Sequence, residues 1–308
     1  MITEPALAAS DVAIVVRSPS ASASVMADYW SITKPEVNFL IVITTAAGFY
    51  VSAPEPLSRF PWIPFLHTLL GTVLVASGAA ALNQWIEHPF DARMRRTARR
   101  AIAAGRIEPQ QALAFGTALS LAGVAYLTLA VGPLVSALAL ATLLSYLFVY
   151  TPLKRRTPMC TLVGAVPGAI PPLIGAAAAR GQLDARAWAL FAVVFLWQFP
   201  HFMAIAWLYR DDYDRAGYAV LPRPAARRRF VAWQTLAPLV ALLAISLAPS
   251  LRSSSAAYAV TAAALSGWFL HAGAQFVARQ SAASARHLLV TSIVYLPVLL
   301  LLQILFTA

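Results

Sequence analysis

Long apolar segments alternate with short polar segments along most of the chain. A transmembrane helix needs about 20 mainly apolar residues to cross a hydrocarbon core of ~30 Å. The segments are continuously apolar, whereas the strands of a membrane barrel alternate between apolar and polar positions. The pattern therefore predicts an all-α polytopic membrane protein with nine transmembrane helices. These helices are expected at residues 37–53, 62–83, 109–130, 134–151, 159–179, 187–208, 230–249, 255–276 and 287–306.

The N-terminal stretch differs from the rest of the chain. Residues 1–28 are rich in alanine and serine, and they lack the basic start and apolar core of a secretory signal. We expect them to form a disordered tail, followed by a single nine-helix transmembrane domain over residues 29–308. Residues 29–35 (YWSITKP) are expected to approach the membrane at headgroup level, and Pro54 and Pro56 to end the first transmembrane helix.

Composition agrees with the hydropathy pattern. Of the 308 residues, 60% are hydrophobic and 11% are charged, and the mean hydropathy of +0.70 is far too high for a soluble domain. The single cysteine, Cys160, excludes an intramolecular disulfide and a paired-cysteine metal or redox motif.

The basic residues predict the orientation in the membrane. If the N-terminus is cytoplasmic, 19 of the 23 Lys and Arg residues fall in cytoplasmic segments, as the positive-inside rule requires. The positive-inside rule then explains the net charge of +11, so the charge does not indicate binding of nucleic acid. We expect the protein to lie in a bacterial-type inner (cell) membrane, with the lipid bilayer as its partner. Three charged loops, residues 83–106, 152–158 and 209–229, would share the cytoplasmic face, where we expect the active site.

The first of these loops carries a regular pattern of oxygen-bearing side chains. Asn83, Glu87 and Asp91 recur at every fourth residue in NQWIEHPFDARMRRTARR, so on a helix they would share one face. Such a face could hold a divalent cation, and the arginines behind it could bind a phosphate group. The alternative is a solvated loop of mixed charge, and the spacing by itself does not decide between the two. The arginines are Arg93, Arg95, Arg96, Arg99, Arg100 and Arg106.

The second acidic cluster is Asp211, Asp212 and Asp214, in WLYRDDYDRAG. Two acidic clusters at the ends of different helices could each hold Mg²⁺, and a diphosphate bound between two such ions becomes a good leaving group. The alternative is a helix-end cluster paired with its own arginines. Because both clusters and the basic loop with Lys154 and Arg155 fall on one side, the combination favours a diphosphate site.

Four segments in this order carry a resemblance: NQWIEHPFDARMRRTARR, YTPLKRRTP, GAIPPLIG and HFMAIAWLYRDDYDRAGYAVLP. Together they resemble the protohaem IX farnesyltransferase (haem O synthase) family of the intramembrane aromatic prenyltransferase superfamily, over roughly residues 34–305. The superfamily motif NxxxDxxxD falls on Asn83, Glu87 and Asp91, with Glu87 where Asp is usual. Further departures from the family pattern fall at Pro89, Ala101, Ala103 and Cys160.

The resemblance implies nine helices around a central cavity and an enzyme that transfers the farnesyl group of farnesyl diphosphate to a vinyl group of haem B. The product would be haem O for haem-copper oxidase assembly, with a downstream haem-modifying enzyme or an oxidase as a possible partner. An alternative acceptor is a quinone precursor or a chlorin. A transporter is a further alternative, but it would scatter charges at the bilayer midplane and contain inverted repeats.

The resemblance also implies roles for individual residues, with Mg²⁺ as the cofactor. The expected metal ligands are Asn83, Glu87, Asp91, Asp211 and Asp212. The diphosphate would be bound by Arg95, Arg96, Arg99, Arg100, Lys154 and Arg155. Asn83, Glu87, Asp91, Asp212 and Lys154 are the expected catalytic residues.

His201 is a candidate for binding haem. It lies ten residues before Asp211, or about 15 Å along a helix, and an ionisable side chain at membrane depth often has a function. Histidine is also a common axial ligand of haem iron. The alternative is a buried histidine that is hydrogen-bonded to a neighbouring helix. In the fifth helix, Pro171 and Pro172 are expected to interrupt the backbone near the cavity.

Overall fold

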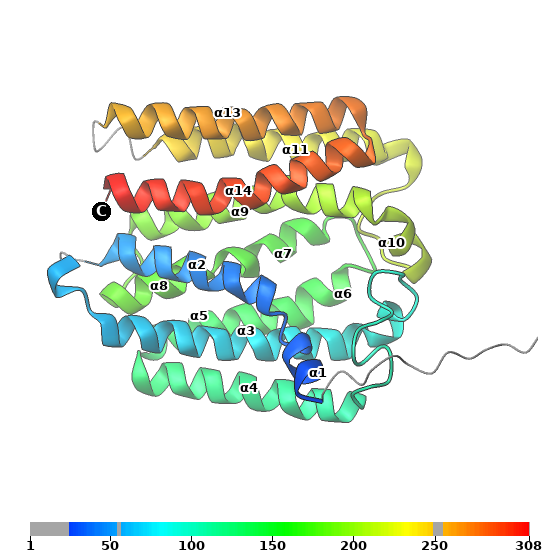
Figure 1. Ribbon diagram of the computed structural model, residues 1–308, viewed down its shortest axis with the longest axis horizontal. Helices are drawn as coiled ribbons and strands as arrows, with labels where there is room; N and C mark the ends of the chain where they lie inside the picture. Colours follow the sequence, from blue (N-terminus) through cyan, green and yellow to red (C-terminus); the bar gives the residue numbers. More distant parts are fainter. Residues whose placement is uncertain (1–24, 54–56, 249–254, 308) are drawn as a thin grey trace, which may run out of the picture.

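A computed structural model of the protein describes residues 25–53, 57–248 and 255–307. The secondary structure of these residues is helical, without a strand, so the predicted all-α class is confirmed. The long helices run roughly along the same axis, side by side (Figure 1). The helices are α1 (Val25–Ile32), α2 (Pro35–Ser52), α3 (Trp62–Asp91), α4 (Pro109–Ala130), α5 (Pro133–Leu144), α6 (Thr151–Leu153), α7 (Cys160–Ala169), α8 (Pro171–Arg180), α9 (Ala185–Leu208), α10 (Arg210–Ala216), α11 (Pro224–Leu247), α13 (Ala256–Arg279) and α14 (Ala282–Thr307).

Two short segments have other helical geometries. A 3₁₀ turn, η1 (Leu57–Arg59), precedes α3, and a wider π segment, η2 (Ser145–Tyr150), continues α5 into α6. A π segment shifts the side chains that follow it around the helix axis, and such segments are frequent at functional sites. Here η2 places two tyrosines beside the charged end of α3, as described below.

Eight segments of the described chain are long and apolar enough to cross a membrane. The additional long helix, α13, has 24 residues but is rich in alanine and small polar residues, and it falls outside that group. The predicted number of nine transmembrane helices therefore stays a prediction. The multi-pass character is clear from large apolar side chains that are exposed on many helices, such as Leu129 (88% exposed) and Trp233 (70% exposed), where lipid would cover them.

Contacts between neighbouring helices link the whole bundle. Helix α3 packs against α2 and α4, α4 against α5, and α5 against α8. Helix α9 packs against α7, α11 and α14, α13 lies between α11 and α14, and α14 returns to α2. Helix α8 packs against both α9 and α2, and its approach to α2 is very close: a Cβ added to Gly175 would lie 2.0 Å from the Thr45 carbonyl oxygen. Small residues at such crossings let membrane helices pack backbone to backbone.

The predicted break in the fifth transmembrane segment is confirmed. Helix α7 ends at Ala169 and α8 begins at Pro171. Proline has no backbone N–H and clashes with the preceding turn, so two consecutive prolines interrupt the hydrogen-bond ladder.

Two predicted boundaries are corrected by the structure. Helix α1 begins at Val25, inside the stretch expected to be a disordered tail, because the buried Asp28 carboxylate accepts hydrogen bonds of 2.9 to 3.1 Å from the Arg106 guanidinium. Helix α3 does not end near Asn83 but continues to Asp91. Residues 1–24, and the prolines Pro54 and Pro56 expected to end the first helix, lie outside the described residues.

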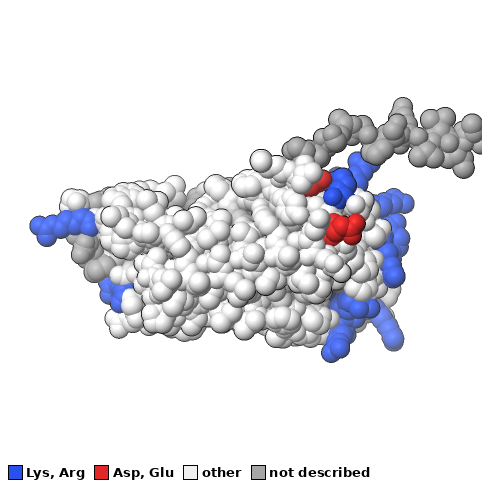
Figure 2. Space-filling view, turned by 90° about the horizontal axis from the view of Figure 1, so that it is seen from below, with Lys and Arg blue, Asp and Glu red and all other residues white. Residues whose placement is uncertain are grey.

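The charged side chains are distributed unevenly. Figure 2 shows most Lys and Arg side chains, together with acidic ones, at one end of the molecule and fewer at the other. This is the end where α1, α10 and the loop after α3 lie (Figure 1). It also holds the motif residues of α3.

Candidate functional site

The last two turns of α3 form the centre of the site. Asn83, Glu87 and Asp91 are all buried, with exposed fractions of 1%, 6% and 1%. They lie on the same helix, so the face predicted from their spacing is present. Burial of three such polar side chains at a helix end is costly unless each has a partner. Each of them has a cationic partner from another part of the chain.

Asn83 is held by three different segments. Its Oδ1 accepts hydrogen bonds from Lys34 Nζ (3.0 Å) and from the Tyr146 hydroxyl (3.2 Å). Its Nδ2 donates to Thr151 Oγ1 (3.2 Å), and that hydroxyl in turn donates to the Tyr146 carbonyl oxygen (2.9 Å). The amide is therefore fixed in orientation, with its oxygen toward the cationic side of the site.

Lys34 occupies the bend between α1 and α2. Its backbone has the left-handed conformation, with φ of 52°, and Pro35 begins α2 directly after it. Burial and the nearby Arg100 lower the pKa of the Lys34 ammonium to about 7, against the opposing effect of Glu87. Among Lys34 and Lys154, Lys34 is therefore the side chain that loses its proton more easily.

Glu87 forms a buried ion pair with Lys154. The Lys154 Nζ lies 2.9 Å from Glu87 Oε1, and both side chains are largely buried. The same ammonium lies 4.6 Å from the centre of the Tyr150 ring. Burial alone would lower the pKa of Lys154, but the Glu87 carboxylate, with Tyr150 and Tyr146, holds that pKa well above its ordinary value. Burial and the Glu87 carboxylate also raise the pKa of the Tyr218 hydroxyl.

Asp91 pairs with an arginine that the following loop brings back to it. Arg100 Nη1 donates to Asp91 Oδ2 (2.7 Å), and Thr97 Oγ1 donates to the Asp91 carbonyl oxygen (2.9 Å). The second carboxylate oxygen, Asp91 Oδ1, is buried and has no hydrogen-bond partner among the described residues. An unsatisfied buried carboxylate oxygen is unfavourable, so it points to a ligand.

The second acidic cluster is divided by the structure. Asp212 is buried and accepts the backbone N–H groups of Arg95 (3.4 Å) and Arg96 (3.3 Å), and it also pairs with Arg215. The Asp211 side chain is 83% exposed and lies 3.6 Å from Arg210. Asp211 and Asp212 therefore both pair with nearby arginines, as the alternative interpretation predicted. Asp212 also connects α10 to the loop after α3 through its bonds to the backbone of Arg95 and Arg96.

The predicted phosphate-binding arginines differ in their surroundings. The Arg96 guanidinium lies over the rings of Tyr209 (4.6 Å) and Tyr213 (5.6 Å), and Arg155 lies over Phe90 (4.1 Å). Arg95 and Arg99 are exposed on the same loop. Of the six predicted residues, Arg100 and Lys154 are the two that pair with a motif carboxylate.

The donor set fits a divalent cation bound through oxygen. In the residues that the structure covers, no three His, Cys, Asp or Glu side chains converge on one point. The available ligands are therefore the Asn83 amide oxygen and the Glu87 and Asp91 carboxylates, and the free Asp91 Oδ1 is an open ligand position. Mg²⁺ typically takes one or two carboxylates from the protein and completes its shell with water and substrate phosphate.

His201 lies on α9, a membrane-spanning helix of the bundle. Its ring stacks on Trp197 at 4.6 Å, and its Nδ1 is 2.8 Å from the Ser292 hydroxyl on α14. The predicted alternative, a hydrogen bond from His201 to a neighbouring helix, is therefore present. Because Nδ1 makes this bond, Nε2 is the ring nitrogen that could bind haem iron. The haem-binding role stays a prediction.

Sequence reasoning missed Lys34, Tyr146, Thr151 and Tyr218. A single lysine at the start of an apolar helix is usually a side chain that reaches toward the headgroups. The tyrosines belong to aromatic stretches that also suit the membrane interface. Two of the segments singled out in the sequence contain a missed residue: YTPLKRRTP contains Thr151, and HFMAIAWLYRDDYDRAGYAVLP contains Tyr218. Both segments pointed instead to their charged residues.

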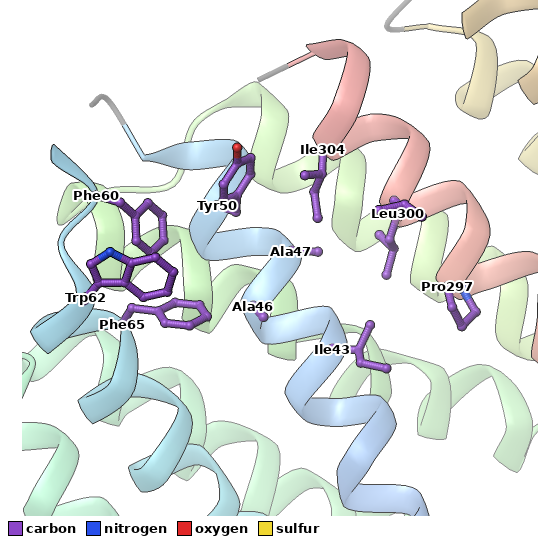
Figure 3. A pocket seen from close by; sticks show the side chains of 11 residues that line it. Ile43, Ala46, Ala47, Tyr50, Phe60, Trp62, Phe65, Pro297, Leu300 and Ile304 are labelled. Atoms are coloured by element: carbon purple, nitrogen blue, oxygen red, sulfur yellow. The ribbon is translucent and has the colours of Figure 1, made fainter. Parts of the chain in front are cut away.

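An apolar pocket of about 420 Å³ lies toward the other end of α2, between α2, α14 and the start of α3. Figure 3 shows the rings of Phe60, Trp62 and Phe65 on one side of α2, with Leu300 and Ile304 on the α14 side. No charged side chain lines it, so it suits a hydrocarbon group rather than a phosphate.

Comparison with known sequences gives a consistent result. The pattern of the UbiA prenyltransferase family matches residues 41–296. A protoheme IX farnesyltransferase of Solibacter usitatus is 46% identical over 281 residues, covering 89% of this chain and 96% of that protein. One of Opitutus terrae is 41% identical over 91% of this chain and 94% of its own length. The human mitochondrial protoheme IX farnesyltransferase is 41% identical over 89% of this chain, which corresponds to 60% of the human protein.

Solved structures show the same fold at low sequence identity. A structure from work on digeranylgeranylglyceryl phosphate synthase matches with a TM-score of 0.73 and 15% identity, over 92% of this chain and 98% of that one. A UbiA homologue from Archaeoglobus fulgidus, bound to GPP and Mg²⁺, matches with a TM-score of 0.65 and 12% identity, over 89% of this chain and 98% of that one.

Proposed function

The chain belongs to the UbiA prenyltransferase family, and from this premise we propose that it transfers the farnesyl group of farnesyl diphosphate to a vinyl group of haem B, giving haem O. Relatives that carry the name protoheme IX farnesyltransferase match it at 41 to 46% identity over most of its length. The structural observation that carries the proposal is the buried end of α3, where two carboxylates and an amide face three cationic side chains.

Within this proposal, Asn83, Glu87 and Asp91 hold a divalent cation, with Asp91 Oδ1 as the open ligand position. Mg²⁺ would neutralise the diphosphate and make it a better leaving group. The A. fulgidus homologue binds Mg²⁺ together with a prenyl diphosphate, which supports the same use here. The metal roles of Asp211 and Asp212 stay predictions. Of the two, the buried Asp212 is better placed.

The cationic residues bind the diphosphate. Lys154, Arg100 and Lys34 lie within the buried site, and Arg96 and Arg155 lie at its edge over aromatic rings. Charge-assisted hydrogen bonds from these groups are strong in a site that excludes water. The exposed Arg95 and Arg99 would attract the anionic substrate to the same end of the molecule.

The bonds change as follows. The bond from farnesyl C1 to the diphosphate oxygen breaks, and its electron pair leaves with the diphosphate. The π electrons of a haem vinyl group form the new carbon–carbon bond to C1, and water adds to the resulting haem-side cation with loss of one proton. The residues of the site contribute by binding the diphosphate and by limiting access of water until the carbon–carbon bond has formed.

The acceptor is the part of the proposal that needs a direct test. The purified protein, with farnesyl diphosphate and Mg²⁺, is offered either haem B or an aromatic quinone precursor, and consumption of each acceptor is followed by chromatography. We expect consumption of haem B only. Turnover of the quinone precursor with haem B left intact would replace the proposed acceptor but keep the prenyl transfer.

We also infer that the charged end faces the cytoplasm. The concentration of Lys and Arg at this end supports the inference through the positive-inside rule. A contact with a haem-modifying enzyme or an oxidase on that side stays a prediction.

A further inference from the structure

Each member of the α3 motif is paired with its own cation. Lys34 Nζ lies 3.0 Å from Asn83 Oδ1, Lys154 Nζ lies 2.9 Å from Glu87 Oε1, and Arg100 Nη1 lies 2.7 Å from Asp91 Oδ2. The three cations come from three separate segments: the α1–α2 bend, the loop after α6 and the loop after α3. We call Lys34, Lys154 and Arg100 the cation triad.

The cation triad occupies oxygen atoms that a metal ion would need. In the proposed function, a divalent cation binds the Asn83 amide oxygen and the two carboxylates. One oxygen of each of these three side chains already accepts a hydrogen bond from the triad: Asn83 Oδ1, Glu87 Oε1 and Asp91 Oδ2. Among the described oxygen atoms of the three motif side chains, Asp91 Oδ1 is the one that is buried without a hydrogen-bond partner. A metal ion that enters alone would therefore compete with three cations for the same oxygens and would be repelled by them.

The charges of the site also disfavour binding of the metal ion alone or of the diphosphate alone. With its triad protonated, the site holds three positive and two negative side chains, so a divalent ion alone would add to an excess of positive charge. A diphosphate alone would meet the Glu87 and Asp91 carboxylates. Metal and diphosphate together can separate the existing pairs, since the carboxylates then face the metal and the triad faces the phosphate oxygens.

We propose that Lys34, Lys154 and Arg100 act as placeholders that hold Asn83, Glu87 and Asp91 in position before the metal binds, and that they exchange these partners for the diphosphate oxygens when metal and diphosphate bind together. This rests on the proposed function. It adds that the two ligands are coupled: each binds weakly alone and tightly with the other.

Lys34 is the most informative member of the triad. It lies outside the NxxxExxxD motif and in a different segment, and its position is fixed by the left-handed backbone before Pro35. It contacts an amide rather than a carboxylate, so its removal does not leave a buried carboxylate unpaired. Lys34 is thus a positioning residue in the empty site and a diphosphate-binding residue in the loaded one.

The test measures binding directly. Mn²⁺ binding without pyrophosphate is followed by electron paramagnetic resonance, and pyrophosphate binding at saturating Mg²⁺ by calorimetry, on the full-length protein in detergent. Both measurements are made at about pH 6, where Lys34 carries its positive charge. For Lys34→Met we expect Mn²⁺ alone to bind about tenfold more tightly and pyrophosphate with Mg²⁺ about tenfold more weakly, because one positive charge is lost. Lys34→Arg, which keeps the charge, should resemble the wild type.

The matched control is Arg156→Met. Arg156 is exposed and lies in the same basic loop as Lys154, so this change removes one positive charge at the same end of the molecule. Both affinities should stay within about twofold of the wild type, since charges separated by water interact weakly. An equal tightening of Mn²⁺ binding in Arg156→Met would overturn the exchange in favour of a general effect of net charge.

Two results for Lys34→Met would overturn the proposal: weaker binding of both ligands, which indicates a purely structural role, or unchanged Mn²⁺ binding. If that variant does not fold, Lys154→Met tests the same exchange and should also bind Mn²⁺ alone more tightly. If the wild-type protein makes haem O but binds metal and pyrophosphate independently of each other, the proposed exchange is refuted and the proposed function is kept. Absence of the product would refute the proposed function instead.

Discussion

Asp91 is the residue whose surroundings most directly indicate a bound ion. One of its carboxylate oxygens pairs with Arg100, and the other is buried without a partner. We expect Asp91→Asn to lower haem O formation at least about a hundredfold, since the loss of one preorganised charge at a reacting site typically has this size. Product is measured by mass, and folding by the elution profile of the purified protein.

The exposed Glu36, at the start of α2, is a suitable control for this change. Glu36→Gln removes a carboxylate that lies outside the site and should keep product formation within about twofold of the wild type. Full activity of Asp91→Asn would remove Asp91 from the metal site.

Lys34 predicts a dependence of diphosphate binding on pH. Its pKa is lowered to about 7 by burial and by Arg100, whereas the pKa of Lys154 is raised. Above pH 7, Lys34 is mostly neutral in the empty protein, and binding of a diphosphate anion requires uptake of a proton. The affinity for pyrophosphate should therefore fall between pH 7 and pH 9, by at most about tenfold per pH unit.

The measurement is calorimetry at several pH values with Mg²⁺ present, comparing the wild type with Lys34→Met. The variant lacks the ionisable group, so the difference between the two isolates Lys34 from the ionisation of pyrophosphate itself. An identical pH dependence in both proteins would mean that Lys34 does not change its charge in this range.

At the residue scale, the sequence predicted the motif but not its partners. The spacing of Asn83, Glu87 and Asp91 by four residues is a property of one helix, and it can be recognised without the fold. Lys34 and Tyr146 reach Asn83 from segments that are far away in the sequence. Nothing in their local pattern distinguishes them from interfacial residues, so only the packing of the helices could show their role.

At the scale of secondary-structure elements, α10 and the loop after α3 depend on one carboxylate. Asp212 accepts the backbone N–H groups of Arg95 and Arg96, and bonds to a charged group typically contribute about 1.5–3 kcal/mol. We expect Asp212→Asn to increase tryptic cleavage of residues 92–108 at least about tenfold and to lower product formation. Limited proteolysis with mass analysis of the fragments measures the first effect.

A different outcome would assign Asp212 a different role. Unchanged cleavage of the loop together with loss of product would contradict the anchoring role and favour the metal-ligand role that the resemblance implied. Normal product formation would contradict the metal-ligand role, and together with unchanged cleavage it would contradict the anchoring role as well.

Helix boundaries show where hydropathy stops being informative. The apolar stretch of α3 fades near Asn83, but the helix continues to Asp91 because its polar residues are satisfied by partners from other segments. The interruption between α7 and α8 was predictable, because it follows from the covalent structure of proline. The start of α1 was not, since it depends on the distant pair of Asp28 and Arg106.

At the scale of the whole molecule, the charge distribution predicts the side of the membrane on which chemistry takes place. After replacement of Cys160, single cysteines at positions 98, 155 and 225 should react with an impermeant thiol reagent only from the cytoplasmic side. A cysteine at position 183 should react only from the opposite side. Labelling of positions 98 and 155 from different sides would contradict a common face for the α3 loop and the Lys154 loop.

The central claim is that the buried charged end of α3 catalyses farnesyl transfer to haem B. The most direct test incubates the purified protein with haem B, farnesyl diphosphate and Mg²⁺ and determines the mass of the extracted pigment. We expect a pigment that has gained the elements of one farnesyl group and one water-derived hydroxyl, dependent on Mg²⁺ and absent with Asp91→Asn. Haem B that stays unmodified while the wild-type protein is folded and binds Mg²⁺ and pyrophosphate would contradict the claim.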